Sequence, residues 1–309
     1  MRIGLIGLGT MGARMALRLL DAEVELTVHD VVRATADDAL ARGARWAENP
    51  AELAADVEVV VTSLPTPAIV EQVMTGPDGV LTVAGPGTVV FDTSTNAHAV
   101  VLRIAGAFAA VGAHFLDAPV SGGPTGAASG QLAIWVGGDE EVFDAHREVL
   151  DLLGDRPRYI GPVGQATVAK LVHNASGYML QTALAEAFSM GLKAGLDPVT
   201  LWSAIRQGGQ GRVRTFDRMA RQFLPGTYET PAFALELAHK DMTLATQLGR
   251  DLGVPMRLAS LAHAEMTEAL ARGWGALDSR ASMRLQLERA GVDLAVDPAA
   301  LEEVLSQDR

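Results

Sequence analysis

The sequence predicts an α/β domain with a doubly wound, mostly parallel sheet over residues 1–162, followed by an all-helical domain over residues 163–309. A long interdomain helix is expected where the two meet. Two observations predict this. Short β-branched apolar runs alternate with Ala- and Leu-rich segments in the first half, which is typical of βαβ units. Beyond about residue 164, long Ala-, Leu- and Met-rich segments punctuated by Gly, Pro and Asp replace them.

The expected elements follow from these runs in order. Strands are expected over residues 3–6, 24–28, 57–62, 88–91, 114–116, 132–136 and 158–160, with helices over 13–20, 34–42 and 140–153. Later helices are expected over 166–194, 198–207, 233–252 and 258–272, with a short one in the polar tail 297–309. A single helix from Gln165 to Lys193 would be on the order of 45 Å long, enough to span two domains.

Composition excludes several classes of protein. The chain has 37 acidic and 25 basic residues, a net charge of −12 and no Lys/Arg cluster, so we expect no nucleic-acid partner. The absence of cysteine excludes disulfides and thiol nucleophiles, and the seven histidines lack metal-binding spacing, so no metal is expected. With no membrane-span pattern and no leader ahead of the first strand, a cytoplasmic protein is expected.

A glycine-rich loop joins the first strand to the first helix. It follows the spacing G-x-G-x-x-G, with the residues Gly7, Leu8, Gly9, Thr10, Met11 and Gly12. The three glycines permit a tight turn, the approach of a pyrophosphate and close helix packing. Asp30 ends the second strand, where an acid binds ribose hydroxyls. The pattern predicts a Rossmann-type domain that binds NAD. NADP is less favoured because its 2′-phosphate would meet Asp30, although Arg33 offers that phosphate a partner.

Further candidates lie after later strands, because ligands of open α/β sheets lie outside the carboxyl ends of strands. Leu64 and Pro65 are expected to line the nicotinamide side, the alternative being an ordinary strand exit with a helix-starting proline. Thr95 comes after the next strand, where by itself it could simply cap the following helix.

Two further groups suit acid–base and anion chemistry. Moving a hydride from an alcohol carbon requires a partner for the hydroxyl proton. Without cysteine, Lys170 is the candidate, and Asn174 lies one helical turn later on the same face. The alternative is a lysine that lies along a helix surface. Ser121, Gly122 and Gly123 form a loop whose backbone N–H groups suit a carboxylate, and a flexible turn is its alternative.

The chain resembles the β-hydroxyacid dehydrogenases, which include 3-hydroxyisobutyrate dehydrogenase, tartronate semialdehyde reductase and, more distantly, 6-phosphogluconate dehydrogenase. The glycine loop with Met15-Ala16 resembles the family's opening. Three later blocks match in order: Asp117 to Gly123 with Gly126-Ala127 and Gly130; Gly161 to Gly164 with Lys170 and Asn174; and Phe233, Leu237 and Lys240-Asp241. The resemblance covers about residues 1–290.

The resemblance implies an NAD-dependent oxidoreductase that transfers a hydride between nicotinamide and a small 3-hydroxy acid or its semialdehyde. It implies Lys170 as general acid/base, with Asn174 beside it. The implied substrate contacts are Ser121, Gly122, Gly123 and Lys240. The implied cofactor contacts are the glycine loop from Gly7 to Gly12, Asp30, Leu64, Pro65, Thr95, Phe233 and Lys240. A homodimer or homotetramer is expected, with a small carboxylate-bearing substrate.

Two departures and three alternatives stay open. Ala166 stands where the family usually has glycine, and the loop 207–212 matches no named member, so the particular hydroxy acid is open. Imine reductases share this architecture but generally lack the catalytic lysine. A sugar-phosphate dehydrogenase would need a basic cluster that the short helical domain lacks. A non-catalytic nucleotide-binding scaffold would be expected to have replaced Lys170 or Asn174.

Overall fold

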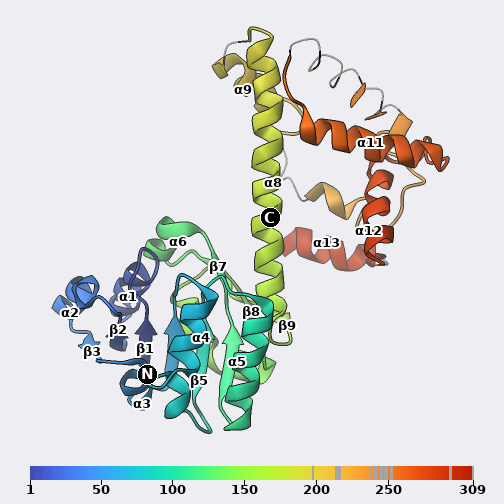
Figure 1. The fold of residues 1–309 in the computed structure, drawn as a ribbon. Coiled ribbons are helices and arrows are strands. Elements are labelled where there is room, and N and C mark those ends of the chain that lie inside the picture. Colours follow the sequence, from blue (N-terminus) through green and yellow to red (C-terminus); the bar gives the residue numbers. More distant parts are fainter. Residues whose placement is uncertain are drawn as a thin grey trace. The chain divides into compact units, whose positions relative to one another are not determined.

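The computed structural model describes residues 1–196, 198–212, 217–236, 238–239, 242–243, 246, 250, 253–291 and 294–307. The chain divides into two units, Met1–Ser176 and Gly177–Arg309 (Figure 1). The division falls inside the long helix α8 (Gln165–Lys193), whose bounds are those expected from the sequence. The domain limit at residue 162 stays a prediction.

A nine-stranded mixed sheet forms the centre of the first unit. Its order is β3-β2-β1-β4-β5-β6-β8-β7, with β9 beside β8, and the pairs from β3 to β6 are all parallel. The order of the first six is that of the Rossmann fold, which confirms the predicted fold class. The strands are β1 (Arg2–Ile6), β2 (Glu25–His29), β3 (Arg45–Trp46), β4 (Val59–Thr62), β5 (Val89–Asp92), β6 (His114–Asp117), β7 (Val120–Ser121), β8 (Ala133–Gly137) and β9 (Arg158–Gly161).

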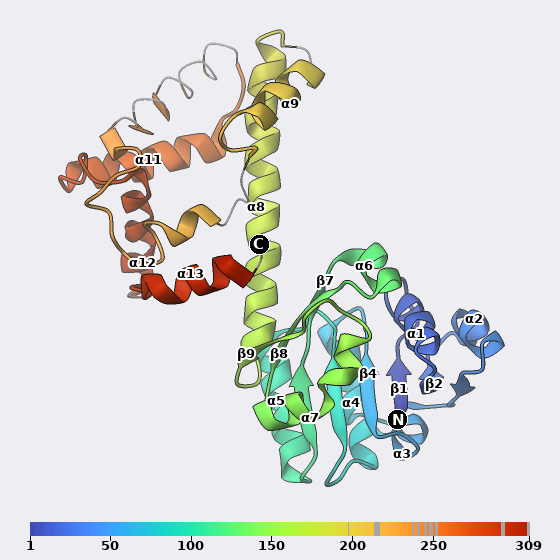
Figure 2. The ribbon, with the colours of Figure 1, turned by 180° about the vertical axis from the view of Figure 1, so that it is seen from behind.

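Helices cover both faces of this sheet (Figures 1 and 2). They are α1 (Gly12–Asp21), α2 (Asp37–Ala41), α3 (Pro50–Ala55), α4 (Pro67–Thr75), α5 (His98–Ala110), α6 (Gly123–Ser129) and α7 (Glu140–Asp151), with the short 3₁₀ turns η1 (Arg33–Ala36) and η2 (Val80–Thr82). The segment 34–42, expected as one helix, is instead divided between η1 and α2. The sequence reasoning gave no bounds for the helices α3 to α6, although it considered a helix after the loop at Pro65 and another after Thr95, and it did not predict the two-residue strands β3 and β7.

The period-two alternation of the central strands builds two apolar cores. Val59 and Val61 of β4 pack into the core under α1 and α7, whereas Val60 packs into the core under α3, α4 and α5. All three valines are at most 1% exposed. Each buried aliphatic side chain contributes about 1.5–3 kcal/mol to stability. Because both faces are covered, only the ends of the strands are left for a ligand.

The second unit is helical in its described residues, apart from an isolated bridge between Ala234 and Asp278. Its elements are α9 (Pro198–Gln207), η3 (Asp217–Ala220), α11 (Arg257–Ala271), η4 (Ser279–Met283), α12 (Arg284–Ala290) and α13 (Pro298–Gln307). The fully buried carboxylate of Asp278 accepts hydrogen bonds from the backbone N–H groups of Ala232 and Arg280. Among the described helices, none has the length and apolarity that a membrane crossing needs.

Candidate active site

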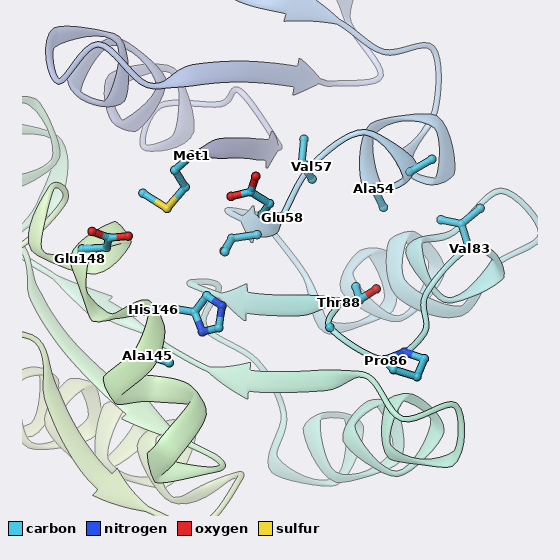
Figure 3. Close-up of a pocket in the computed structure, with 13 residues that line it drawn as sticks. Met1, Ala54, Val57, Glu58, Val83, Pro86, Thr88, Ala145, His146 and Glu148 are labelled. Carbon is cyan, nitrogen blue, oxygen red and sulfur yellow. The ribbon is translucent and has the colours of Figure 1, made fainter.

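A cavity of about 650 Å³ opens at the amino ends of the central strands (Figure 3). Met1, Glu58 and Thr88, which line it, precede β1, β4 and β5 respectively. Ligands of open α/β sheets bind at the opposite edge, outside the carboxyl ends of the strands. The glycine loop, Asp30, Leu64 and Thr95 follow β1, β2, β4 and β5 and so lie at that opposite edge.

Packing within the chain explains the first and third glycines of the loop. Gly7 has φ +95°, and its N–H donates to the carbonyl of His29 at 2.9 Å. A Cβ on Gly7 would collide with the carbonyl oxygen of Ser63, and one on Gly12 with the carbonyl oxygen of Gly7. These two glycines therefore let β1, β4 and α1 meet closely.

Gly9 has no such internal reason to be glycine. A Cβ built on it would meet nothing within 4 Å, its φ lies outside the positive range, and it is exposed. In the part of the chain that the structure describes, no side chain caps α1 and no acid lies in its first turn. The helix N-terminus is thus left to bind an external anion, which is the arrangement that the pyrophosphate of NAD requires.

Asp30 joins the glycine loop to the end of β2. One of its carboxylate oxygens accepts the N–H of Leu8 at 2.7 Å, and the other accepts that of Val32 at 2.9 Å. Arg33 is turned to other partners: its guanidinium lies 4.9 Å from the ring centroid of Trp46 and 3.8 Å from the carboxylate of Glu48. Asp30 is therefore fixed beside the loop, while Arg33 is engaged on an exposed surface.

The buried carboxylate of Asp92 fixes the loop after β5. It accepts hydrogen bonds from Thr62 Oγ1 at 2.9 Å, the backbone N–H of Ser94 at 3.1 Å and Asn96 Nδ2 at 3.0 Å. Burial raises the pKa of Asp92, an effect that these hydrogen bonds oppose. Thr95 is exposed between the buried Ser94 and Asn96, so the loop presents it outward.

The same loop is tied to the end of β4. The backbone N–H of Leu64 donates to Ser94 Oγ at 2.9 Å. Leu64 is half-buried and Pro65 is exposed. The structure therefore brings Leu64, Pro65 and Thr95 to adjacent strand ends, as the sequence predicted, while their cofactor contacts stay a prediction.

Asp117 anchors the first turn of α8 to the end of β6. Its carboxylate accepts the N–H of Gly164 at 2.7 Å and both the N–H and the hydroxyl of Thr167, at 2.6 and 2.7 Å. Gly137 leaves room for this carboxylate, since a Cβ there would meet it. The helix begins at Gln165 with Ala166 fully buried, so the departure from the family pattern is accommodated in its first turn.

Lys170 lies three residues after Thr167 and is only 8% exposed. Burial lowers its pKa. Among the described residues, no carboxylate lies within ion-pair distance of its ammonium group. Asn174, one turn later, is half-buried. A desolvated lysine without a counter-charge exchanges a proton more readily near neutral pH than an exposed one.

The Ser121 loop contacts the same helix. Ser121 Oγ lies 3.2 Å from His173 Nε2, and the His173 ring packs against Trp135 with centroids 5.2 Å apart. Gly122 and Gly123 have φ values of +136° and +62° and are exposed. The sequence reasoning missed His173. Its position three residues after Lys170, on the same side of the helix, is the signal that would have identified it.

Other predicted contacts belong to the second unit. Phe233 is 44% exposed there, and its carbonyl accepts the N–H of Ser279 at 2.8 Å. Lys240, with Leu237 and Asp241, lies outside the described residues. Within the described ranges, no group of three or more His, Asp or Glu side chains is placed to hold a metal ion.

Family models match nearly the whole chain. The model described as the NAD binding domain of 6-phosphogluconate dehydrogenase matches residues 2–161. The model described as NAD-binding of NADP-dependent 3-hydroxyisobutyrate dehydrogenase matches residues 164–286. The glycine loop, Asp30 and these matches define the protein as a dehydrogenase with a dinucleotide-binding domain.

Relatives narrow this class. 2-(Hydroxymethyl)glutarate dehydrogenase of Eubacterium barkeri is 35% identical over 95% of this chain and 97% of its own. NAD-dependent L-serine dehydrogenase of Pseudomonas aeruginosa is 33% identical over 90% of this chain and 95% of its own. Among solved structures, Mycobacterium tuberculosis 3-hydroxyisobutyrate dehydrogenase with L-serine is 31% identical in sequence. The match covers 92% of this chain and 98% of that one, with a TM-score of 0.64.

The chain belongs to the β-hydroxyacid dehydrogenase family, and it is an NAD-dependent oxidoreductase that acts on CH–OH groups. An imine reductase from Pseudomonas sp. has a TM-score of 0.78 at 19% identity, over 92% of this chain and 98% of its own. At that identity the likeness shows a shared fold alone.

Proposed function

We propose that the protein oxidises a small 3-hydroxy acid of the form HOCH₂–CHR–COO⁻ to its semialdehyde, or reduces the semialdehyde, with Lys170 as the proton-transfer residue. One observation carries the proposal: Lys170 is buried without a described counter-charge, on the helix that hydrogen-bonds the Ser121 loop. The loop suits a carboxylate, and the lysine suits the proton of a neighbouring hydroxyl.

The relatives' names support this substrate class. 2-(Hydroxymethyl)glutarate, L-serine and 3-hydroxyisobutyrate are the compounds named for three of them. All three carry a CH₂OH group on the carbon that bears a carboxylate, and they differ in the third substituent, R. A site that recognises the shared part needs hydrogen-bond donors for the carboxylate. It also needs a proton acceptor for the hydroxyl, whose carbon lies two bonds from the carboxyl carbon.

The roles of the residues follow from this chemistry. NAD, held by the glycine loop and Asp30, would supply the acceptor for the hydride of the CH₂OH carbon. Lys170, in its neutral form, takes the hydroxyl proton during oxidation and returns it during reduction. Asn174 holds the hydroxyl oxygen from the next turn of α8. Ser121 and the N–H groups of Gly122 and Gly123 hold the carboxylate, and fixed backbone donors do so at a small entropy cost.

The test is a turnover screen of hydroxy acids with NAD, followed by the Lys170→Ala variant. We expect turnover to fall by about 10²–10⁴-fold, as for the loss of a general acid–base group, while NAD affinity is retained. Lys193→Ala is the matched control, because Lys193 is an exposed lysine at the other end of α8. Near-normal turnover of Lys170→Ala would reject the assignment.

The remaining alternatives have less support. Generally, imine reductases lack this lysine, and a non-catalytic scaffold would have no need to keep a desolvated one. We also propose a homo-oligomer, which the exposed apolar Val168, Leu171 and Val172 of α8 support. Light scattering after size-exclusion chromatography tests it, and a monomeric mass would contradict it. The cytoplasmic location stays a prediction.

A further inference from the structure

Two histidine rings stack against each other inside the second unit. His239 belongs to the segment 235–246, whose described residues are helical, and His263 lies on α11. The ring centroids are 4.5 Å apart and the ring planes differ by 25°. Each Nε2 also contacts a threonine of the other segment: that of His239 lies 2.9 Å from Thr267 Oγ1, and that of His263 lies 2.8 Å from Thr243 Oγ1. A reciprocal pair of side-chain contacts therefore joins the two segments.

The threonine hydroxyls decide which nitrogen of each ring carries the hydrogen. Thr243 Oγ1 donates its one hydrogen to the backbone carbonyl of His239 at 2.9 Å, and Thr267 Oγ1 donates to that of His263 at 2.8 Å. Each hydroxyl then has only lone pairs to offer the opposite ring, so each Nε2 must carry a hydrogen and donate it. In the neutral pair, Nδ1 of each ring is therefore the atom that takes up a further proton.

The charged groups of both segments are engaged away from the rings. Glu265 and Glu268 of α11 bind the guanidinium of Arg289 at 2.7 and 2.6 Å. Glu236, on the other segment, directs its carboxylate at Gly275, where a Cβ would lie 3.6 Å from Oε2. Within the described ranges, no carboxylate lies within ion-pair distance of either histidine ring.

A second proton on the pair is opposed by the first. Burial lowers the pKa of His239, and the adjacent His263 lowers it further. Both rings are half-buried. Two imidazolium rings with centroids 4.5 Å apart repel each other, and the repulsion is stronger where water is partly excluded and no counter-charge is close. The stacked arrangement therefore suits a neutral or singly protonated pair better than a doubly protonated one.

The other end of the same contact is apolar and does not depend on charge. Leu235 and Ala269 are fully buried in one cluster with Leu285. Leu235 lies about one turn before His239, and Ala269 lies six residues after His263. Separation of the two rings would thus open the contact at one end, while the apolar end keeps the segment attached to α11.

We propose that His239 and His263 form a proton-sensitive clasp, which holds the segment 235–246 on α11 while the pair carries at most one proton and opens when it takes up a second. The inference concerns neither the hydroxy acid nor its proton transfer, so it goes beyond the proposed function and does not rest on it. Lys240 and Asp241, which follow His239 in the sequence, lie outside the described residues. The clasp makes the attachment of this segment depend on pH in the range where histidines titrate.

An NMR titration of the histidine rings in the full chain tests the coupling. In the unaltered protein we expect both rings as Nε2–H tautomers when neutral, and two protonation steps more than about one pH unit apart. The variant His263→Gln keeps an amide N–H₂ that can donate to Thr243 Oγ1 but takes up no charge. In this variant His239 should titrate in one step, at a higher pH than in the unaltered protein. An unchanged titration of His239 would overturn the proposal.

Hydrogen exchange of the segment 235–246 tests the opening itself. The open clasp takes up protons that the closed pair resists, so opening is favoured as the pH falls through the ordinary pKa of histidine and is unaffected above it. Relative to the intrinsic rate, exchange should be about 10-fold or more faster near pH 5.5 than near pH 7.5. The acceleration should be lost in His239→Gln and His263→Gln and retained in His146→Gln, the matched control on α7. Equal exchange at the two pH values in the unaltered protein, or acceleration that persists in both clasp variants, would overturn the proposal.

Discussion

The carboxylate of Asp117 accepts both the backbone N–H and the hydroxyl of Thr167, at 2.6 and 2.7 Å, across 50 residues of sequence. The two residues lie at the end of β6 and in the first turn of α8. Because the helix is rigid beyond that turn, its attachment to the sheet sets where Lys170 lies. The position of the proposed catalyst therefore depends on a carboxylate that touches no reacting atom.

Asp117→Asn should weaken both the fold and the reaction. An amide retains one acceptor and turns an N–H₂ group toward a backbone or hydroxyl donor, which leaves buried donors unpaired at a cost of about 2–3 kcal/mol. We expect a lower free energy of unfolding in urea and a lower kcat, with KM for NAD nearly unchanged. Asp139→Asn is the control: this exposed acid caps α7 through the N–H groups of Glu141 and Val142. Unchanged kcat in Asp117→Asn would contradict the positioning role.

Gly9→Ala and Gly12→Ala should separate cofactor binding from folding. The Cβ at position 9 meets only open space, so we expect the midpoint of urea unfolding to stay unchanged while the Kd for NAD rises, by about 10-fold or more if one phosphate contact is lost. The Cβ at position 12 collides with the Gly7 carbonyl, so that variant should be destabilised. Calorimetric titration with NAD checks the first variant. Wild-type affinity there would mean that no pyrophosphate lies against Gly9.

NAD should be used more efficiently than NADP. The carboxylate of Asp30 is fixed by two backbone N–H groups, so it cannot turn away from a 2′-phosphate. The two negative groups would repel each other at close range. A penalty of about 1.4 kcal/mol corresponds to a tenfold preference. Arg33→Ala should leave this preference in place, because Arg33 is engaged with Trp46 and Glu48. The measurement is kcat/KM for each cofactor, and a higher value with NADP would refute the prediction.

The pH dependence of oxidation should report Lys170. Oxidation requires the neutral amine, so kcat/KM should rise with pH through the pKa of Lys170 and level off above it. Burial lowers that pKa, so the rise should be centred below the ordinary range of a lysine. Reduction requires the ammonium form and should fall over the same interval. Lys170→Arg, whose guanidinium stays charged, should abolish this step in the profile, and its persistence would assign the titration to another group.

Much of the first unit could be predicted from its sequence. The strand runs are local and nearly continuous in Val, Ile and Leu, and the glycine spacing specifies the turn between β1 and α1. The bounds of α8 are equally local, because the segment lacks proline. The start of the helix in the segment 34–42 was predicted too early. Asp37 and Asp38 suit the first turn of a helix, so α2 begins at Asp37, after the 3₁₀ turn η1.

The polar connections of the site could not be predicted, because their partners are distant in sequence. Asp92 and Asp117 occupy the same level on neighbouring strands. Asp92 accepts from Thr62 at the end of β4, 30 residues away, and Asp117 accepts from Gly164 before α8, 47 residues away. The pairing of Ser121 with His173 likewise joins residues 52 positions apart. No local pattern marks such pairs, since they arise only once the sheet order and the start of α8 are set.

The burial of Lys170 sets the stability of the fold against the proposed activity. A charged amine that lacks a described counter-charge costs folding free energy at neutral pH, and the cost vanishes only above the ordinary pKa of lysine, where the unfolded chain has also lost its proton. A methionine of similar length would avoid it. Thermal selection without an activity requirement would therefore enrich variants that have lost this lysine, the proposed proton-transfer residue. Laboratory evolution of a heat-resistant form should therefore measure turnover at every round, because the proposed role of Lys170 makes the more stable side chain at this position the less active one.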